Sequence, residues 1–83
     1  MKVKIYTTTY CGYCKRAKEL FRSKGIEFEE IDVTNDEGQR KKLVDLTGKR
    51  TVPQIFINEK GIGGYDDLAL LEESGELDKL LKS

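Results

Sequence analysis

Two cysteines, Cys11 and Cys14, are the residues of this sequence whose type and spacing point most clearly to chemistry. They lie where a predicted strand ends and a predicted helix begins. Cys11 is expected at the helix start, where unpaired backbone N–H groups and the helix dipole stabilise a thiolate, the nucleophilic form. Cys14 shares a helix face with it, with the Cβ atoms roughly 5–6 Å apart. A disulfide between them needs only a small adjustment, so we predict reversible thiol–disulfide chemistry.

Two other uses of the cysteines are weaker interpretations. A structural zinc site requires four ligands, and this chain has one pair of thiols and no histidine, so that two copies of the chain would have to share the metal. The cysteines could also be packing residues, because free cysteine is often buried. A C-x-x-C motif at a strand-to-helix turn favours the redox interpretation over both alternatives.

Two further segments have features of a binding site. Pro53, the only proline, comes immediately before a predicted strand. A cis bond here would leave the backbone N–H and C=O of Val52 free to pair with an extended substrate, whereas a trans bond, the commoner case, would make Pro53 a simple strand starter. Downstream, Gly63 and Gly64 precede Asp66 at a predicted helix start, an arrangement that suits a bound carboxylate.

The elements that must position these segments alternate between strand and helix. Alternating apolar residues predict the strands, spacings of three and four predict the helices, and glycines mark helix ends. The predicted elements are strands at 2–7, 26–33, 54–57 and 62–63, helices at 12–24, 36–47 and 66–75, a hairpin turn at 58–61 and an amphipathic segment at 77–81. This order predicts an α/β fold, in which a mixed sheet with one parallel crossover and one antiparallel hairpin is covered by helices in three layers.

The apolar positions of these elements give the expected core, and the residue before the second helix gives its cap. Asn35 or Asp36 is expected to cap the helix that ends at Gly48. The residues expected in the core are Val3, Ile5, Tyr6, Phe21, Phe28, Ile31, Leu43, Ile55, Phe56, Ile57, Leu68 and Leu71.

Length and composition limit the range of functions. The 83 residues predict one domain, 1–83, and 37% apolar with 36% charged residues is typical of a soluble globular protein. The absence of histidine excludes a histidine-based catalytic triad. No apolar run approaches the roughly 20 residues of a membrane span, and the N-terminus lacks a secretory signal. Two cysteines are too few for the disulfide framework of a small secreted domain, so we expect a reducing cytoplasm.

The net charge is zero, but the charges are unevenly distributed. Residues 1–25 carry seven basic residues and one acidic residue, whereas residues 26–37 carry six acidic residues and no basic one. The basic segment either attracts an anionic partner or is a solvated helix face, and both interpretations stay open. Neither a nucleic-acid-binding motif nor an aromatic platform accompanies it, so we expect no nucleic-acid partner.

Five stretches of the sequence together resemble the glutaredoxin family. They occur in the family's order and spacing and span nearly the whole chain. They are Ile5-Tyr6-Thr7, Cys11-Gly12-Tyr13-Cys14, Arg16-Ala17-Lys18, Thr51-Val52-Pro53-Gln54-Ile55-Phe56-Ile57 and Gly63-Gly64-Tyr65-Asp66-Asp67-Leu68. The resemblance implies a thioredoxin fold with a four-stranded mixed sheet, a cis bond before Pro53, and a monomeric glutathione-dependent thiol–disulfide oxidoreductase.

The resemblance also implies roles for individual residues. Cys11 attacks protein disulfides and protein–glutathione mixed disulfides, and Cys14 resolves protein disulfides in the two-thiol route. Glutathione is the reducing co-substrate, and disulfide-containing or glutathionylated proteins are the partners. No residue is implied to bind a resident metal ion. The residues implied to bind glutathione are Tyr13, Arg40, Thr51, Val52, Pro53, Gly64, Tyr65, Asp66 and Asp67.

Two positions depart from the pattern that is common in the family. Thr8 stands where many members carry a lysine, which should weaken the contact with the glycyl carboxylate of glutathione unless Arg40 or Lys15 compensates. Gly12 stands in place of the commoner proline and should loosen the helix start. Gly12 also leaves an alternative function open, in which a dimer binds and transfers a [2Fe–2S] cluster held by Cys11 and glutathione thiolates from each half.

Overall fold

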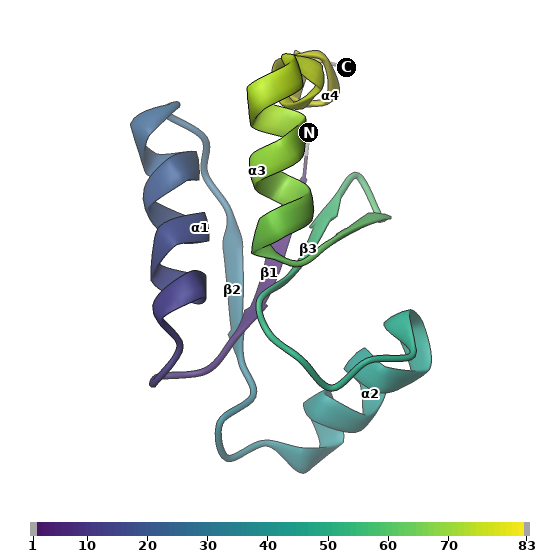
Figure 1. Cartoon of the computed structure of the whole chain (residues 1–83). Helices are drawn as coiled ribbons and strands as arrows, with labels where there is room; N and C mark the ends of the chain where they lie inside the picture. Colours follow the sequence, from purple (N-terminus) through teal and green to yellow (C-terminus); the bar gives the residue numbers. More distant parts are fainter. Residues whose placement is uncertain (1, 83) are drawn as a thin grey trace.

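Strands and helices alternate along the chain in the computed structural model, which describes residues 2–82 (Figure 1). The elements are β1 (Val3–Thr7), α1 (Gly12–Ser23), β2 (Glu29–Asp32), α2 (Glu37–Thr47), β3 (Gln54–Ile57), β4 (Lys60–Gly63), α3 (Tyr65–Ser74) and α4 (Glu76–Lys82). Every predicted strand and helix is present, and the amphipathic segment at 77–81 lies in α4.

The strands form one mixed sheet in the order β2-β1-β3-β4. β1 and β2 are parallel, with Tyr6 opposite Ile31, and α1 makes the crossover between them. β3 is antiparallel to β1 on one side and to β4 on the other. The predicted parallel crossover and the predicted antiparallel hairpin are therefore both confirmed.

Two strand boundaries differ from the sequence prediction. β2 pairs with β1 only over Glu29–Asp32, so the strand predicted at 26–33 is too long at both ends. β4 begins at Lys60, inside the predicted turn, because the chain reverses over just Asn58 and Glu59. These two residues have positive φ angles of 51° and 70°, as a tight two-residue hairpin loop requires.

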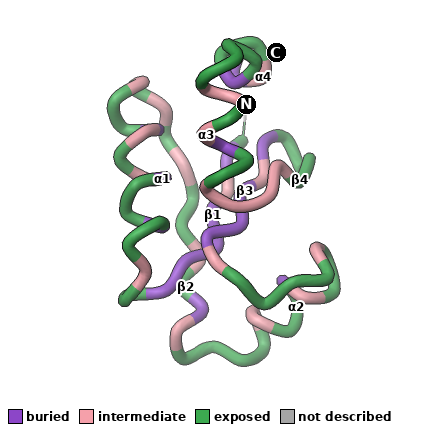
Figure 2. Tube along the Cα trace, in the orientation of Figure 1, coloured by how far each residue is buried: buried purple, intermediate pink, exposed green. Residues whose placement is uncertain are grey.

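Helices cover both faces of the sheet, so the predicted three layers are confirmed. On one face, α1, α3 and α4 pack against β1 and β3. This larger core consists of Val3, Ile5, Ala17, Phe21, Ile55, Ile57, Leu68, Leu77 and Leu81. On the opposite face, Leu43 of α2 packs against Tyr6 and Val33. Figure 2 shows burial concentrated in the central strands β1 and β3, which carry buried residues on both faces.

Four of the expected core residues are only partly buried. Phe28 and Leu71 lie at the margin of the larger core, and Ile31 and Phe56 at the margin of the smaller one. β2 is an edge strand, so residues in or near it have neighbours on fewer sides. Phe56 faces the side that α2 covers incompletely. The remaining expected residues are buried.

Local signals set the helix ends as predicted. Asp36, rather than Asn35, caps α2, because its Oδ1 accepts a hydrogen bond of 3.0 Å from the backbone N–H of Gln39. Gly48 ends the same helix in the left-handed conformation, with φ of 75°. None of the helices in the described part of the chain is long and apolar enough to cross a membrane.

Candidate redox-active site

Cys11 is the N-cap residue of α1 and lies where β1 leads into that helix. Its backbone is extended, with φ of −100° and ψ of 111°, so the side chain turns back over the first helical turn. The sulfur accepts a hydrogen bond from the backbone N–H of Cys14 at 3.1 Å. Amide donors and the helix dipole both favour an anion at this position. Cys11 is also partly exposed, so it is placed to act as a thiolate nucleophile.

Cys14 has a different environment, although it lies only one helical turn away. Its side chain is buried, with 1% of the residue exposed, and both cysteines are free thiols. Burial raises the pKa of the Cys14 thiol to about 12; the hydrogen bond with Cys11 adds to the increase, and a backbone hydrogen bond from Thr8 opposes it. Cys14 therefore keeps its proton at neutral pH. The site thus combines an accessible nucleophile with a buried, protonated thiol.

The loop before β3 lies directly against Cys11. The peptide bond between Val52 and Pro53 is cis, so the expectation from the family resemblance is confirmed. The Cys11 thiol donates a hydrogen bond to the carbonyl oxygen of Val52 at 3.7 Å. The Val52 N–H makes no hydrogen bond to any residue between 2 and 82. A backbone donor and acceptor are therefore available to an extended substrate next to the nucleophile.

A pocket of about 260 Å³ opens beside this loop. Three segments that are far apart in the sequence meet there, namely the start of α1, the loop before β3 and the start of α3. The lining residues are Tyr13, Lys49, Thr51, Val52, Pro53, Gln54, Gly64, Tyr65, Asp66 and Asp67. The structure therefore brings together all the binding residues predicted from the sequence except Arg40.

Two aromatic rings form one side of the pocket. Tyr13 and Tyr65 are stacked, with ring centroids 5.8 Å apart and planes 30° apart. The guanidinium of Arg16 lies 5.4 Å from the centre of the Tyr13 ring, within the range of a cation–π contact. Tyr13 is 55% exposed, so its ring is available to a bound substrate.

The start of α3 carries two carboxylates with different surroundings. Oδ2 of Asp67 accepts a hydrogen bond from the backbone N–H of Gly64 at 3.1 Å, so this carboxylate caps the helix. Gly63 has φ of +112°, and a side chain there would collide with the Asp67 carboxylate. Asp66 is exposed and makes no hydrogen bond or ion pair within residues 2–82. Its carboxylate is therefore free to bind a ligand.

Comparison with known proteins agrees with this geometry. A model of the Glutaredoxin family matches residues 3–62. Glutaredoxin 3 of Escherichia coli strain K12 is 48% identical over 80 residues, which cover 96% of each chain. The chain belongs to the glutaredoxin family. A glutaredoxin of Pseudomonas aeruginosa is also 48% identical, over 81 residues that cover 98% of this chain and 96% of that one.

Solved glutaredoxin structures share the fold. A crystal structure of a buckwheat glutaredoxin–glutathione complex superimposes with a TM-score of 0.90 and 35% identity, covering 96% of this chain and 76% of that one. The solution structure of a glutaredoxin from Brucella melitensis superimposes with a TM-score of 0.87 and 48% identity, covering 99% of this chain and 89% of that one. The predicted thioredoxin fold is confirmed, and the chain is a thiol–disulfide oxidoreductase of the glutaredoxin type.

Arg40 lies outside the glutaredoxin pocket. It is on α2, and its Nη2 donates a hydrogen bond to the carbonyl oxygen of Arg50 at 3.4 Å. Arg50 comes just before the pocket residue Thr51, so Arg40 contacts the backbone of the loop that forms the pocket. Its Nε is buried and has no hydrogen-bond partner in the described part of the chain.

Thr8, the position where glutaredoxins often carry a lysine, does not line the pocket. The residue is 4% exposed, and its hydroxyl has no hydrogen-bond partner among the described residues. Lys15, which we considered as a replacement cation, does not line the pocket either. Lys49 is the basic residue that does. Sequence reasoning missed it, although it lies only two residues before Thr51.

Gln54 is the second lining residue that sequence reasoning missed. It is buried at the start of β3, and its Nε2 donates a hydrogen bond to Oγ1 of Thr51 at 3.1 Å. This contact fixes the loop on the other side of Pro53. The alternating pattern of the strand gave no signal for this role, because a glutamine at a strand start is ordinarily solvated.

Proposed function

We propose that this glutaredoxin uses glutathione to reduce protein–glutathione mixed disulfides and protein disulfides. The observation that supports this best is the position of Cys11, which is partly exposed at the N-cap of α1 and donates a hydrogen bond to the Val52 carbonyl, beside a Val52 N–H that has no partner within residues 2–82. The adjoining pocket offers stacked aromatic rings, a free carboxylate and a lysine. The buckwheat glutaredoxin, which has the same fold, was crystallised as a glutathione complex.

In the one-thiol route, the Cys11 thiolate attacks the glutathione sulfur of a mixed disulfide. The protein thiolate leaves and takes up a proton, and Cys11 becomes glutathionylated. The thiolate of a second glutathione then attacks this glutathione sulfur, which releases glutathione disulfide and restores the Cys11 thiolate. Cys14 takes no part, because its thiol is buried and protonated.

In the two-thiol route, the Cys11 thiolate attacks one sulfur of a substrate disulfide and forms a mixed disulfide with it, and the other substrate sulfur leaves as a thiolate that takes up a proton. Cys14 then loses its proton and attacks the Cys11 sulfur, so the second substrate thiolate leaves. Once Cys11 is in a disulfide, its hydrogen bond and its charge no longer raise the pKa of Cys14, although burial still does. Two glutathione molecules reduce the resulting Cys11–Cys14 disulfide and leave as glutathione disulfide.

The pocket residues suggest how glutathione is oriented. The cysteinyl unit pairs with the N–H and C=O of Val52, which places its sulfur beside Cys11. The γ-glutamyl carboxylate faces the N-terminus of α3 near Gly64, where backbone N–H groups favour an anion. Asp66, rather than the capping Asp67, binds the ammonium group, because its carboxylate has no other partner within residues 2–82.

The glycyl carboxylate of glutathione is bound by a basic residue near the loop before β3. Lys49 lines the pocket and is exposed, so it replaces the lysine that this chain lacks at position 8. Arg40 has the supporting role of fixing the loop backbone at Arg50.

A mixed-disulfide assay tests the proposal. The reduction of a small glutathione mixed disulfide is followed for the wild type, Cys11→Ser and Cys14→Ser, with glutathione as reductant. We expect activity to be lost in Cys11→Ser and retained in Cys14→Ser. With a protein disulfide as substrate, Cys14→Ser should lose activity as well. A wild type that is inactive with glutathione but active with dithiothreitol would refute the glutathione dependence and leave the oxidoreductase activity intact.

Cluster binding is a second candidate, which one observation favours. A Cβ atom added at Gly12 would have no heavy atom within 4 Å, so no neighbouring side chain crowds the turn beside Cys11. Within residues 2–82 no group of three or more acidic or cysteine side chains could hold a metal alone, so a [2Fe–2S] cluster would need Cys11 from two chains and two glutathione thiolates. Anaerobic reconstitution with iron, sulfide and glutathione tests this: a coloured dimer supports it, and a colourless monomer refutes it.

We also propose that residues 1–83 act as one redox unit, as a monomer, on protein substrates in a reducing cytoplasm. A glutathione-rich compartment returns Cys11 and Cys14 to the thiol state after each cycle. Light scattering of the reduced chain tests the monomer. Trapping with Cys14→Ser, which cannot resolve the mixed disulfide with a protein, identifies the substrates.

A further inference from the structure

A second pocket lies on the sheet face that α2 covers, away from the thiols. Its volume is about 320 Å³, which is within the range of about 300–1,000 Å³ that is usual for small-molecule sites. It shares no lining residue with the pocket beside Cys11. The lining residues are Lys2, Lys4, Tyr6, Lys42, Leu46, Phe56 and Glu59.

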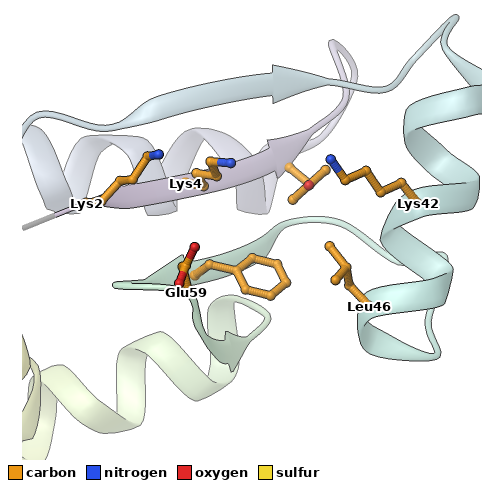
Figure 3. A pocket seen from close by; sticks show the side chains of 7 residues that line it. Lys2, Lys4, Lys42, Leu46 and Glu59 are labelled. Atoms are coloured by element: carbon orange, nitrogen blue, oxygen red, sulfur yellow. The ribbon is translucent and has the colours of Figure 1, made fainter.

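The rim of this pocket carries an excess of positive charge. Figure 3 shows the side chains of Lys2 and Lys4 along β1, with Lys42 extending from α2 toward them. None of these three ammonium groups forms an ion pair within residues 2–82. Glu59 is the one carboxylate that lines the pocket. Three ammonium groups against one carboxylate favour an anionic ligand.

Apolar side chains form the interior of the pocket. The rings of Tyr6 and Phe56 meet edge to face, with centroids 5.8 Å apart and planes 71° apart. Leu46 completes the apolar surface from α2 and is 56% exposed, although it is a large aliphatic side chain. An aromatic ligand would cover Leu46 and pack against the ring of Phe56, and such ring pairs are favourable in offset or edge-to-face geometry.

Tyr6 adds a hydrogen-bond donor. The residue is 2% exposed, and its hydroxyl has no hydrogen-bond partner among the described residues. Burial and the charge of Glu29 raise the pKa of Tyr6, so the hydroxyl keeps its proton at neutral pH. The hydroxyl is not among the fully buried polar atoms of the described residues, so it is accessible and can donate a hydrogen bond to an acceptor oxygen of a ligand in the pocket.

We propose that this pocket binds a small aromatic carboxylate, with its ring against Phe56 and Leu46 and its carboxylate toward Lys4, Lys42 and the Tyr6 hydroxyl. At roughly 30 Å³ for each water-sized group, the volume accommodates on the order of ten non-hydrogen atoms, which is the size of a benzene ring with a short acid chain. The ligand is separate from glutathione, because the two pockets share no residue.

Nuclear magnetic resonance of the full, reduced, ¹⁵N-labelled chain tests this with hydrocinnamate as the probe. We expect saturable shifts of the amides of Tyr6, Lys42 and Phe56, and none at Tyr13 or Tyr65 beside the thiols. The neutral hydrocinnamamide should bind on the order of tenfold more weakly, because it leaves the ammonium groups unpaired.

Two neighbouring lysines of α2 provide a matched pair of variants. Lys42→Ala should weaken hydrocinnamate binding about two- to fivefold, the usual effect of an exposed ion pair. Lys41→Ala changes the net charge and the helix composition equally, but Lys41 does not line the pocket, so binding should be unchanged. The proposal would be overturned if both variants weakened hydrocinnamate binding equally, or if the neutral amide bound as tightly as the acid. It would also be overturned if the shifts did not saturate or were confined to the thiol pocket.

Discussion

Removing the buried hydroxyl of Thr7, the last residue of β1, or of Thr8, the residue after it, should change the free energy of unfolding in opposite directions. Thr7 and Thr8 are both buried, with 0% and 4% exposed. The Thr7 hydroxyl donates a hydrogen bond of 2.7 Å to Oε2 of Glu30, whereas the Thr8 hydroxyl has no partner among the described residues. Replacing threonine with valine keeps the branched shape and exchanges the hydroxyl for a methyl group. Thr7→Val and Thr8→Val are therefore a matched pair.

The size of each effect follows from what the hydroxyl contacts. A hydrogen bond to a charged group contributes about 1.5–3 kcal/mol, and Glu30 is also bound by Lys18 at 2.9 Å, so we expect Thr7→Val to cost about 1.5 kcal/mol. An unpaired buried hydroxyl costs about 1–3 kcal/mol, so Thr8→Val should stabilise the chain by about 1 kcal/mol. The free energies of unfolding of the two variants should then differ by about 2.5 kcal/mol, which corresponds to about 10–20 °C in Tm for a domain of this size.

The loss in Thr7→Val should also depend on pH. Lys18, and after it Thr7, lower the pKa of Glu30, so the stabilisation from this carboxylate is present above its unfolded pKa and disappears as the pH falls through the lowered value. The cost of Thr7→Val should therefore shrink in acid, whereas the gain in Thr8→Val should not change.

Urea unfolding of the reduced chains, followed by circular dichroism, measures both free energies. Glutathione-dependent activity serves as a control for Thr8→Val, because the backbone of Thr8 that contacts Cys14 is retained. If Thr8→Val destabilises the chain as much as Thr7→Val, the Thr8 hydroxyl has a partner such as a buried water, and the reasoning is refuted.

Three further predictions concern the thiol pocket and its buried cysteine. Asp66→Ala should raise the KM for glutathione about two- to fivefold and leave the free energy of unfolding unchanged. Asp67→Ala should lower the free energy of unfolding by about 0.5–2 kcal/mol, because it removes the cap of α3. An equal rise in KM in both variants would contradict this division of roles. Lys49→Ala should raise the same KM about two- to fivefold and leave kcat unchanged, and an unaltered KM would remove Lys49 from the glutathione site. Because folding raises the pKa of Cys14 from 9.0 to about 12, the free energy of unfolding of the reduced chain should fall as the pH rises through this interval. In parallel urea titrations it should fall more steeply with pH than that of Cys14→Ala. Identical slopes would show that the pKa of Cys14 does not change on folding.

The parts of the fold that could be predicted from the sequence depend on interactions within one or two turns of chain. Cys11 and Asp36 cap helices because their side chains accept hydrogen bonds from amides three residues ahead. Gly48 and Gly75 end helices because they adopt positive φ angles of 75° and 85°. The parallel pairing of the first two strands followed from the same local elements, since a strand-helix-strand unit makes a parallel crossover. The cis bond before Pro53 came from the family resemblance instead, because local chemistry alone favours trans.

The parts that could not be predicted depend on how distant segments meet. Lys49 and Arg40 look equally basic in the sequence, but the loop after α2 places the first at the pocket and turns the second toward the carbonyl of Arg50. Thr8 follows the strand predicted at 2–7, and only the packed structure shows that its hydroxyl is buried with no partner among the described residues. The same applies to Asp66 and Asp67, whose roles separate only when Asp67 reaches back to cap α3.

The division of work between the two thiols follows from one helix start. The N-cap position leaves Cys11 partly exposed with an amide donor at 3.1 Å, and the next turn carries Cys14 into the interior, where burial keeps its proton in place. In the proposed one-thiol route, exchange with glutathione therefore needs only the partly exposed thiol of Cys11 and the backbone N–H and C=O of Val52. In the proposed two-thiol route, resolution of a protein disulfide needs the buried thiol of Cys14 as well, and its raised pKa should make that step the slower one at neutral pH.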